Sequence, residues 1–166
     1  MNIEIVQVEE EQREILAHLI ELYEYDFSEF ENSDVNAYGL YGYSYLDYYW
    51  TEKGRYAYFI KADGKLAGFA MVCGYCYVSK DRETRFLSEF FVMRKYRRQG
   101  VGKYAAGEVL KKHPGKWELT VHPNNRVSQK FWKAVIDNVA AGPAEIVENV
   151  ADVYEDAPAT AYLFTV

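Results

Sequence analysis

The sequence predicts an α/β protein of the mixed α+β class, with about seven strands and about four helices. Segments that alternate like β-strands and segments with the period of an amphipathic helix follow one another along the chain. Asp63 and Gly64 stand between two apolar runs and indicate an antiparallel hairpin, because both residues tolerate positive φ. A length of 166 residues suits one domain, so we expect residues 1–166 to form a single domain.

The chain begins with a short strand and a helix. Ile3–Val8 alternates apolar residues with polar ones, as a strand does. From Glu9 to about Phe27 the apolar residues recur at helical spacing. His18 lies in this helix, and we expect it at the surface or at the boundary of the core.

The next part of the chain is rich in acids and tyrosines. Tyr25–Asn36 is acidic and has little periodicity, whereas Tyr38–Trp50 holds six tyrosines and indicates a loop and a short helix. Two interpretations stay open. The segment either forms an acceptor pocket, in which carboxylates attract a cation and rings stack on it, or an acidic solvated loop before an amphipathic helix.

The hairpin strands are Arg55–Lys61 and Lys65–Tyr75, and the second contains a lone C-x-x-C formed by Cys73 and Cys76. Zinc would need two further thiolate or imidazole ligands, and none stands at suitable spacing. We therefore expect structural cysteines and no metal site.

The rest of the chain alternates strands with helices. Either Asn124 or Asn125 can cap the last helix. In chain order, the expected elements are a strand at Phe86–Met93, a helix from Val101 to His113, a strand at Trp117–His122, a helix that ends at Ala141-Gly142-Pro143, and closing strands at Glu145–Tyr154 and Thr160–Val166.

Composition and charge narrow the possible partners. The net charge of −6 argues against nucleic-acid binding, which needs a broad basic surface. No apolar stretch approaches the ~20 residues of a membrane span. The N-terminus MNIEIVQVEE is acidic and has no signal-peptide pattern, so we expect a cytoplasmic protein with no membrane partner.

The most informative stretch is Phe86–Gly102. Its apolar strand is followed by a cluster of cations and two glycines, after which a helix begins. A helix N-terminus presents unpaired N–H groups, and glycine lets the main chain approach a ligand closely. We interpret the stretch as the diphosphate site of a cofactor. The cations and glycines are Arg94, Lys95, Arg97, Arg98, Gly100 and Gly102.

Two common phosphate motifs do not fit this stretch. A Walker A loop needs G-x-x-x-x-G-K-[ST], but Tyr104 follows Gly102-Lys103, and Arg97 occupies the place of the first glycine. Gly100-Val-Gly-Lys-Tyr-Ala105 matches the letters of a Rossmann fingerprint. However, Gly100 stands eight positions after Val92, and a hairpin precedes the motif in place of a parallel unit.

A third pattern matches in two places. Arg97, Gly100 and Gly102 occupy the defined positions of [QR]-x-x-G-x-[GA], and Asn125-x-x-Ser-x-x-Phe-Trp132 matches a later motif of Asn, a small residue and Phe-Tyr. In these motifs and in its order of elements the chain resembles the GCN5-related N-acetyltransferase (GNAT) superfamily, most strongly over Leu87–Val135. The resemblance implies a GNAT-like fold, with a central, mostly antiparallel sheet whose two central strands splay apart.

The resemblance also implies acetyl-CoA as the cofactor. Main-chain groups of Phe90, Phe91 and Val92 would pair with its acetyl and pantetheine amides. The later motif would line the pantetheine arm through Asn125, Phe131 and Trp132. The N–H groups expected around the diphosphate belong to Arg98, Gln99, Gly100, Val101, Gly102 and Lys103, with the side chains of Arg97 and Arg98 in support.

Amine acetylation needs a base, because a lysine-like ammonium has a pKa near ~10.4. We predict Glu89 as this catalytic residue, since it is a carboxylate in an otherwise apolar strand beside the expected acetyl group, where burial would raise its pKa. The alternative is a solvated or ion-paired Glu89. In the family, the N–H of Val92 or its neighbour would act as an oxyanion donor.

Trp132 departs from the family pattern. Many relatives carry a tyrosine there that protonates the leaving thiolate, and an indole N–H cannot serve as that acid. Tyr96 and Tyr154 are possible substitutes, and the sequence does not rank them. His122 is a secondary candidate for the base, although we expect a structural role for it.

The sequence thus predicts an N-acetyltransferase that acts by direct attack in a ternary complex. Its acceptor would be a primary amine of a small molecule or a peptide, contacted by Tyr25, Asp26, Tyr41 and Tyr45. Two alternatives stay open: a non-catalytic CoA-binding regulatory module on the same fold, which Trp132 favours, and a nicotinamide-binding enzyme. We expect a monomer or a homodimer.

Overall fold

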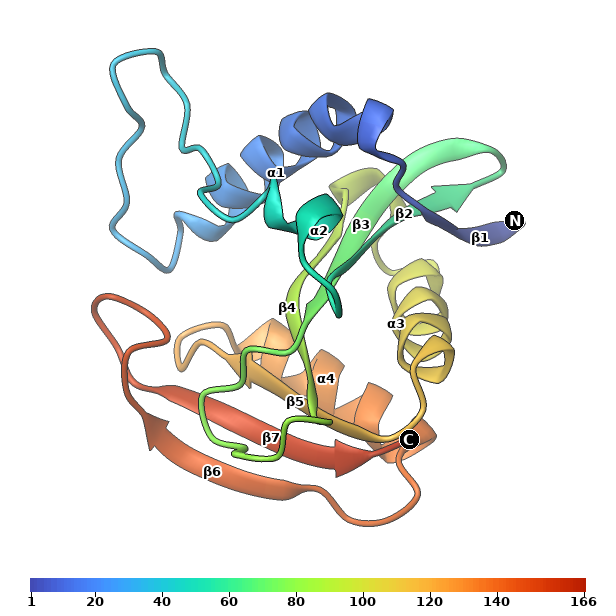
Figure 1. Ribbon diagram of the computed structural model, residues 1–166, viewed down its shortest axis with the longest axis vertical. Coiled ribbons are helices and arrows are strands. Elements are labelled where there is room, and N and C mark those ends of the chain that lie inside the picture. Colours follow the sequence, from blue (N-terminus) through green and yellow to red (C-terminus); the bar gives the residue numbers. More distant parts are fainter.

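The computed structural model describes all residues from Met1 to Val166 and contains one seven-stranded sheet (Figure 1). The strand order is β1-β2-β3-β4-β5-β7-β6, and β4 with β5 is the parallel pair in an otherwise antiparallel sheet. This sheet confirms the predicted fold class. The strands are β1 (Ile3–Gln7), β2 (Tyr56–Ala62), β3 (Lys65–Cys73), β4 (Arg85–Val92), β5 (Lys116–Val121), β6 (Glu145–Val150) and β7 (Ala159–Thr165).

Four α-helices lie on the two faces of the sheet, with α1 and α2 on one face and α3 and α4 on the other (Figure 1). The apolar stripe of α1 packs against Phe69 and Phe91, and we name this side of the sheet the α1 face. On the other side, the α4 face, Val135 of α4 belongs to the same core as Leu87 of β4. The helices are α1 (Arg13–Phe27), α2 (Tyr48–Thr51), α3 (Val101–Lys112) and α4 (Arg126–Val139).

The two central strands separate after a short contact. β4 and β5 pair at Arg85 and Phe86, and Phe86 opposite Glu118 is their last pair. The rest of β4 has no partner on this side, which is the splay expected of the fold. We call the space beyond the last pair the wedge.

Ser88 forms a bulge in β4. Met71 of β3 faces Glu89 and Val72 faces Leu87, so Ser88 is an extra residue between them. Its hydroxyl donates to the main-chain oxygen of Met71 at 3.0 Å and lies 2.8 Å from the Tyr49 hydroxyl of α2. Because a bulge redirects the side chains that follow it, Glu89 shares the α1 face with Met71 and Phe91.

The predicted end of the strand Glu145–Tyr154 is wrong. β6 ends at Val150, and Tyr154 lies in the loop before β7. Asn149 and Asp152 have φ values of 59° and 64°, and left-handed backbone at these two positions breaks the regular strand. Tyr154 is therefore a loop residue.

Other local predictions agree with the structure or differ by a few residues. Asp63 and Gly64 turn the hairpin with φ values of 49° and 75°. Asn125 caps α4, since its Oδ1 accepts the N–H of Ser128 at 3.0 Å. β3 ends at Cys73, so Cys76 lies in the following loop, and both thiols are free. None of the helices has both the length and the apolar character needed to cross a bilayer.

Candidate active site

The wedge exposes main-chain groups at the end of β4. The N–H of Met93 donates to the oxygen of Ala67 on β3 at 2.8 Å. Successive residues of a strand point their N–H groups to opposite sides, so the N–H of Val92 is directed away from β3 and toward the wedge. The chain here has the form of an unpaired strand edge, to which an extended amide-containing ligand can add as a strand.

The loop after β4 presents a row of unpaired N–H groups. None of the main-chain N–H groups from Arg98 to Lys103 donates to an acceptor in the protein, and the N–H of Tyr104 is the first to do so, to Gly100 O at 3.0 Å. Arg98 and Gly100 have φ values of 61° and 83°, which curve the main chain just before α3. Unpaired N–H groups at a helix N-terminus form an anion site.

Gly102 keeps the start of α3 close to its neighbours. A Cβ at this position would lie 3.2 Å from Cε2 of Phe131 and 3.6 Å from Cγ2 of Val92. The loop, the end of β4 and α4 therefore meet at this glycine. Val101 is fully buried, which fixes the first turn of α3 in the core.

A cleft of about 330 Å³ continues from this loop between α3 and α4. Its lining includes Lys103 and Lys111 of α3 and Asn138 of α4. Glu108 also lines the cleft and pairs with Lys111 at 3.4 Å. Lys103 and the amide of Asn138, beside a row of free N–H groups, suit a ligand with phosphate groups. The residues present thus fit the predicted cofactor.

The side chains of Arg94 and Arg97 bind α1 instead of facing the loop. Both guanidinium groups hold the carboxylate of Asp26, at 2.7 Å for Arg94 and 2.6 Å for Arg97. Nε of Arg97 also donates to Val92 O at 2.7 Å. Burial alone would raise the pKa of Asp26, but the hydrogen bonds and charges of the two arginines lower it. Asp26 is therefore not a free charge for an ammonium group.

Glu89 lies beside the wedge on the α1 face, in a partly buried position. Its Oε1 accepts the hydroxyl proton of Tyr43 at 3.1 Å, and it forms no ion pair. Burial raises the pKa of Glu89 to about 7, the charge of Glu24 adds to this rise, and the hydroxyls of Tyr23 and Tyr43 partly oppose it. A carboxyl with this pKa can accept a proton at neutral pH.

Tyr154 and His122 form the opposite side of the wedge. Their ring centroids are 4.8 Å apart, and Phe27 of α1 packs on both. Burial raises the pKa of Tyr154, and the charge of Glu89 raises it further, so the tyrosine keeps its proton. His122 is buried and accepts the N–H of Asn124 at Nδ1, and burial lowers its pKa, all of which suits a neutral structural residue.

Three aromatic residues pack between β4 and α4. The ring of Phe90 stacks on Phe131 at 5.8 Å, and the indole of Trp132 contacts both rings edge-on at 5.1 and 4.8 Å. Trp132 is almost fully buried in this core, whereas Phe131 is partly exposed next to Gly102. Tyr96 is buried in the core beneath α3, against which Phe90 also packs.

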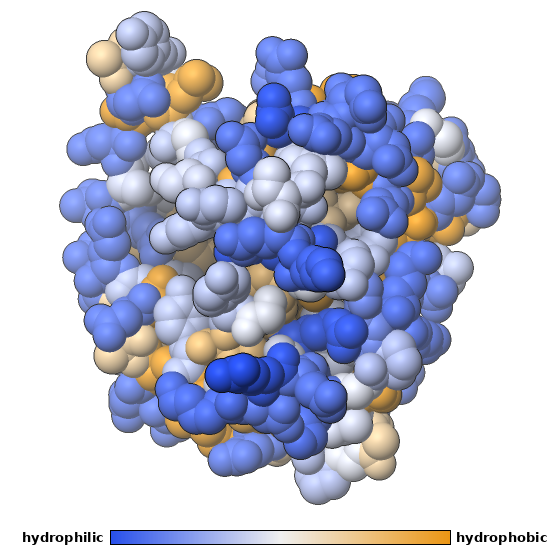
Figure 2. Space-filling view, viewed as in Figure 1, coloured by the Kyte–Doolittle hydropathy of each residue, from blue (hydrophilic) through white to orange (hydrophobic).

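The other predicted residues have varied surroundings. Tyr25 and Tyr45 are 68% and 58% exposed, and the N–H of Tyr41 donates to Glu21 at 2.8 Å. The side chain of Gln99 donates to Lys95 O at 2.6 Å, which shapes the loop. Figure 2 shows the surface from the same direction as Figure 1. A recess lies between the α1 side and the β5 side, and part of its floor is apolar (Figure 2).

Sequence reasoning missed residues that surround Glu89. Tyr23 packs edge-on against Phe69 and Phe91 at 5.8 and 5.9 Å, and Tyr43 reaches the carboxylate from the long loop before α2. The tyrosine-rich composition of this region hinted at a ring-lined site. No spacing in the sequence singled out these two positions.

Comparisons with known proteins agree on one family. The model of the acetyltransferase (GNAT) family matches residues 16–135, which is more than half of the chain. No curated protein matches the chain at a comparable level.

Solved structures share the fold over nearly the whole chain at low identity. An acetyltransferase from Thermus thermophilus has a TM-score of 0.72 and 14% identity, with 100% of this chain and 98% of that chain covered. The aminoglycoside acetyltransferase AAC(6')-Ib in complex with coenzyme A has a TM-score of 0.70 and 13% identity, with 99% and 95% covered. NAA60 from Arabidopsis thaliana, in complex with a bisubstrate analogue, has a TM-score of 0.62 and 14% identity, with 99% and 97% covered.

The match of the family model, the splayed central strands and the row of free N–H groups before α3 lead to the same conclusion. The chain belongs to the acetyltransferase (GNAT) family and is an acetyl-CoA-dependent acetyltransferase.

Proposed function

We propose that the protein transfers the acetyl group of acetyl-CoA to a primary amine by direct attack in a ternary complex, with Glu89 as the base. The observation that carries this proposal is the position of Glu89. It is a carboxyl with a pKa of about 7, free of ion pairs, on the same strand whose unpaired N–H at Val92 faces the wedge.

The chain's own groups divide the binding of acetyl-CoA between two regions. The N–H groups from Arg98 to Lys103 hold the diphosphate, and Lys103 stands in the adjoining cleft for further phosphate. The main chain of Phe90–Val92 and the ring of Phe131 hold the pantetheine arm. Val92 O is already engaged by Arg97, so Arg97 shapes this part of the site through the main chain.

The proton balance follows from the groups at the wedge. Acetyl-CoA supplies a thioester, so a C–N bond forms and a C–S bond breaks. Glu89 takes the proton that the ammonium loses, directly or through water, and the neutral amine then attacks, with the Val92 N–H as the donor available to a developing oxyanion. The nitrogen loses its second proton after the C–N bond forms, which balances the proton that the leaving thiolate takes up. A thiolate with a pKa near ~8.5 takes up a proton at neutral pH.

Of the two hydroxyls considered for this last proton, Tyr154 has the better position. It packs on His122, the residue after β5, on the side of the wedge opposite β4, whereas Tyr96 is buried under α3. Trp132 packs in the core and takes no part in the proton transfer.

The acceptor enters on the α1 face, along the loop between α1 and α2. Tyr25, Tyr41 and Tyr45 belong to this side and stay predictions for acceptor contacts. A small-molecule or peptidyl amine is in line with two of the solved structures, an aminoglycoside acetyltransferase and an enzyme bound to a bisubstrate analogue. Monomeric or homodimeric state and cytoplasmic location also stay predictions.

The experiment is a thiol-release assay with acetyl-CoA against a panel of primary amines. At least one amine should give turnover that depends on both substrates. Tight CoA binding without thiol release on any amine would contradict the proposal and support a non-catalytic CoA-binding module.

A further inference from the structure

Glu118 of β5 is a buried carboxylate that the proposed reaction does not use. It is 0% exposed and forms no ion pair. Its oxygens accept three consecutive main-chain N–H groups, from Tyr77 at 2.7 Å, Val78 at 3.1 and 3.2 Å, and Ser79 at 2.8 Å. Burial of a charge is costly unless hydrogen bonds replace its water, so this contact fixes the loop strongly.

The position of Glu118 connects this loop to the wedge. Glu118 faces Phe86 in the last β4–β5 pair, so its carboxylate lies at the closed end of the wedge. Leu87 belongs to the core of the α4 face, and side chains alternate along a strand, so Phe86 and its partner Glu118 point to the α1 face. Glu89, beyond the bulge, shares that face.

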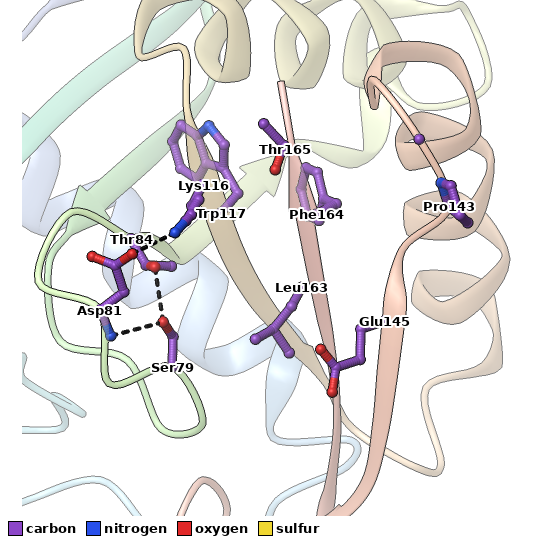
Figure 3. Close-up of a pocket in the computed structure, with 11 residues that line it drawn as sticks. Ser79, Asp81, Thr84, Lys116, Trp117, Pro143, Glu145, Leu163, Phe164 and Thr165 are labelled. Atoms are coloured by element: carbon purple, nitrogen blue, oxygen red, sulfur yellow. Dashed lines mark hydrogen bonds and ion pairs between the residues drawn. The ribbon is translucent and has the colours of Figure 1, made fainter.

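The loop that Glu118 holds runs between β3 and β4 and crosses in front of β5 (Figure 1). Its far end has separate anchors: Lys116 pairs with Asp81 at 2.6 Å, and the hydroxyls of Ser79 and Thr84 lie 2.8 Å apart (Figure 3). These contacts border a polar cavity of about 380 Å³ on the outer side of the loop. Ser79 takes part in both sets of contacts, but the Lys116–Asp81 ion pair can be altered separately from the hydrogen bonds of Glu118.

Tyr77 is the side chain that this loop brings to the acceptor side. Its ring packs edge-on against Phe86 at 5.5 Å, and 42% of the residue is exposed. Burial raises the pKa of Tyr77, and the charge of Glu89 raises it further. Phe86 and Glu89 lie on the same face of β4, so the Tyr77 ring that packs on Phe86 lies on the acceptor side of the sheet, at the closed end of the wedge.

We propose that Glu118 is a positioning residue for the acceptor: it pins the main chain of Tyr77–Ser79 so that the Tyr77 ring forms the end wall of the acceptor space beside Glu89. This inference rests on the proposed function, because the wall matters only where an amine is acetylated. Tyr77 would then limit the size of the chemical group that the acceptor can carry next to its amine.

Kinetics of Glu118→Gln and Tyr77→Ala test the proposal, with the amine found by the thiol-release assay. Each variant should raise KM for the amine about tenfold and leave KM for acetyl-CoA within about twofold. The double variant should be no worse than either single variant, because both changes remove the same wall. Lys116→Ala is the matched control, since it cuts the exposed outer anchor of the same loop and should leave both KM values unchanged.

Hydrogen exchange supplies a readout that does not need turnover. The N–H groups of Tyr77, Val78 and Ser79 should be protected in the wild-type chain and lose protection in Glu118→Gln, with β2 and β3 unchanged. If these N–H groups stay protected in Glu118→Gln, then Glu118 does not fix the main chain of Tyr77–Ser79, and the proposal is overturned.

A fall in thermal stability without a change in KM for the amine would give Glu118 a merely structural role and overturn the proposal. Additive effects in the double variant would do the same. Tyr77→Ala keeps the test valid if Glu118→Gln does not fold, because Tyr77 lies in a loop and 42% of it is exposed. An unchanged KM for the amine in Tyr77→Ala would also overturn the proposal. A wild-type chain that acetylates no amine would instead overturn the proposed function, and the acceptor role of Glu118 with it.

Discussion

Glu89 owes its properties to its surroundings in the fold. It sits among aromatic side chains with the Tyr43 hydroxyl at 3.1 Å and no cation in reach, and burial raises its pKa to about 7. An exposed glutamate with a pKa near ~4.3 would be a much weaker base toward an ammonium. The burial that would make this carboxylate a useful base also makes its charged form costly to the fold.

Glu89→Gln tests the role of the base. Turnover should fall by about 10²–10⁴-fold, because general base catalysis typically contributes that much, while the affinity for CoA should stay unchanged. In the wild-type enzyme the contribution of Glu89 should make kcat/KM rise with pH up to about pH 7, where its carboxyl becomes ionised. The variant should lose this titration from its pH profile. Steady-state rates from pH 5.5 to 9 measure both effects, and unchanged turnover would remove Glu89 from its role.

The same substitution should change how stability depends on pH. The folded-state pKa of Glu89 lies above that of an unfolded glutamate, so the folded chain binds this proton more tightly. The stabilising contribution is fully present below about pH 4.3 and is lost as pH rises through about 7. Glu89→Gln should therefore melt higher than the wild type at pH 8, with a smaller difference at pH 5. A lower melting temperature for the variant at pH 8 would show that the buried charge is better compensated than its contacts indicate.

Single residues differ in how far the sequence could predict them. Glu89 stands out as the acid of an apolar strand, and the helix cap could be narrowed to Asn124 or Asn125, because both signals are local. Asp26 was predicted as an acceptor contact, but the fold brings Arg94 and Arg97 to it from 68 and 71 positions away in the chain. No local sequence pattern predicts these ion pairs between Asp26 and the two arginines.

At the scale of elements, the site depends on the loop that joins β4 to α3. The strand, the glycines and the helix are neighbours in sequence, so their order and their free N–H groups could be predicted from it. The bulge at Ser88 could not, because it depends on the register with β3 and on the Tyr49 hydroxyl of α2. Glu118 was equally hidden, since its three N–H partners lie about 40 positions away.

Gly102→Val tests the loop. The branched side chain would meet Phe131 and Val92, push the start of α3 away from β4 and disturb the row of N–H groups. We expect CoA affinity to fall at least about tenfold, measured by isothermal titration.

Gly107→Ala in the same helix is the matched control for this change. Its new Cβ would have its closest contact with Val139 Cγ1 at 3.7 Å, an ordinary van der Waals distance. Alanine also favours a helix interior by about 1 kcal/mol over glycine, so folding should be kept. Gly107 lines the cleft beyond the row of N–H groups, so CoA affinity should fall far less than in Gly102→Val. Equal affinity in Gly102→Val and Gly107→Ala would show that the start of α3 does not form the diphosphate site.

At the scale of the whole molecule, the splay of β4 from β5 leaves the end of β4 unpaired in the middle of the sheet. A ligand that lies in the wedge contacts β4, α3 and α4 at once, so its binding should stabilise the folded chain as a unit. At 100 times Kd, a ligand specific for the folded state contributes about 2.7 kcal/mol. For a chain of this size that corresponds to a rise of roughly 5–10 °C in Tm.

Thermal unfolding with saturating CoA measures this effect, and NADH is the control for the nicotinamide alternative. CoA should raise Tm by several degrees and NADH should leave it unchanged. A rise in Tm with NADH and none with CoA would favour a nicotinamide-binding enzyme.

The most direct test of the account is an amide NMR titration with CoA, because the central claim concerns named N–H groups. The resonances of Arg98–Lys103 should move together with those of Phe90–Val92, and the exchange of these amides with water should slow. CoA that binds without moving the Arg98–Lys103 resonances would contradict the account.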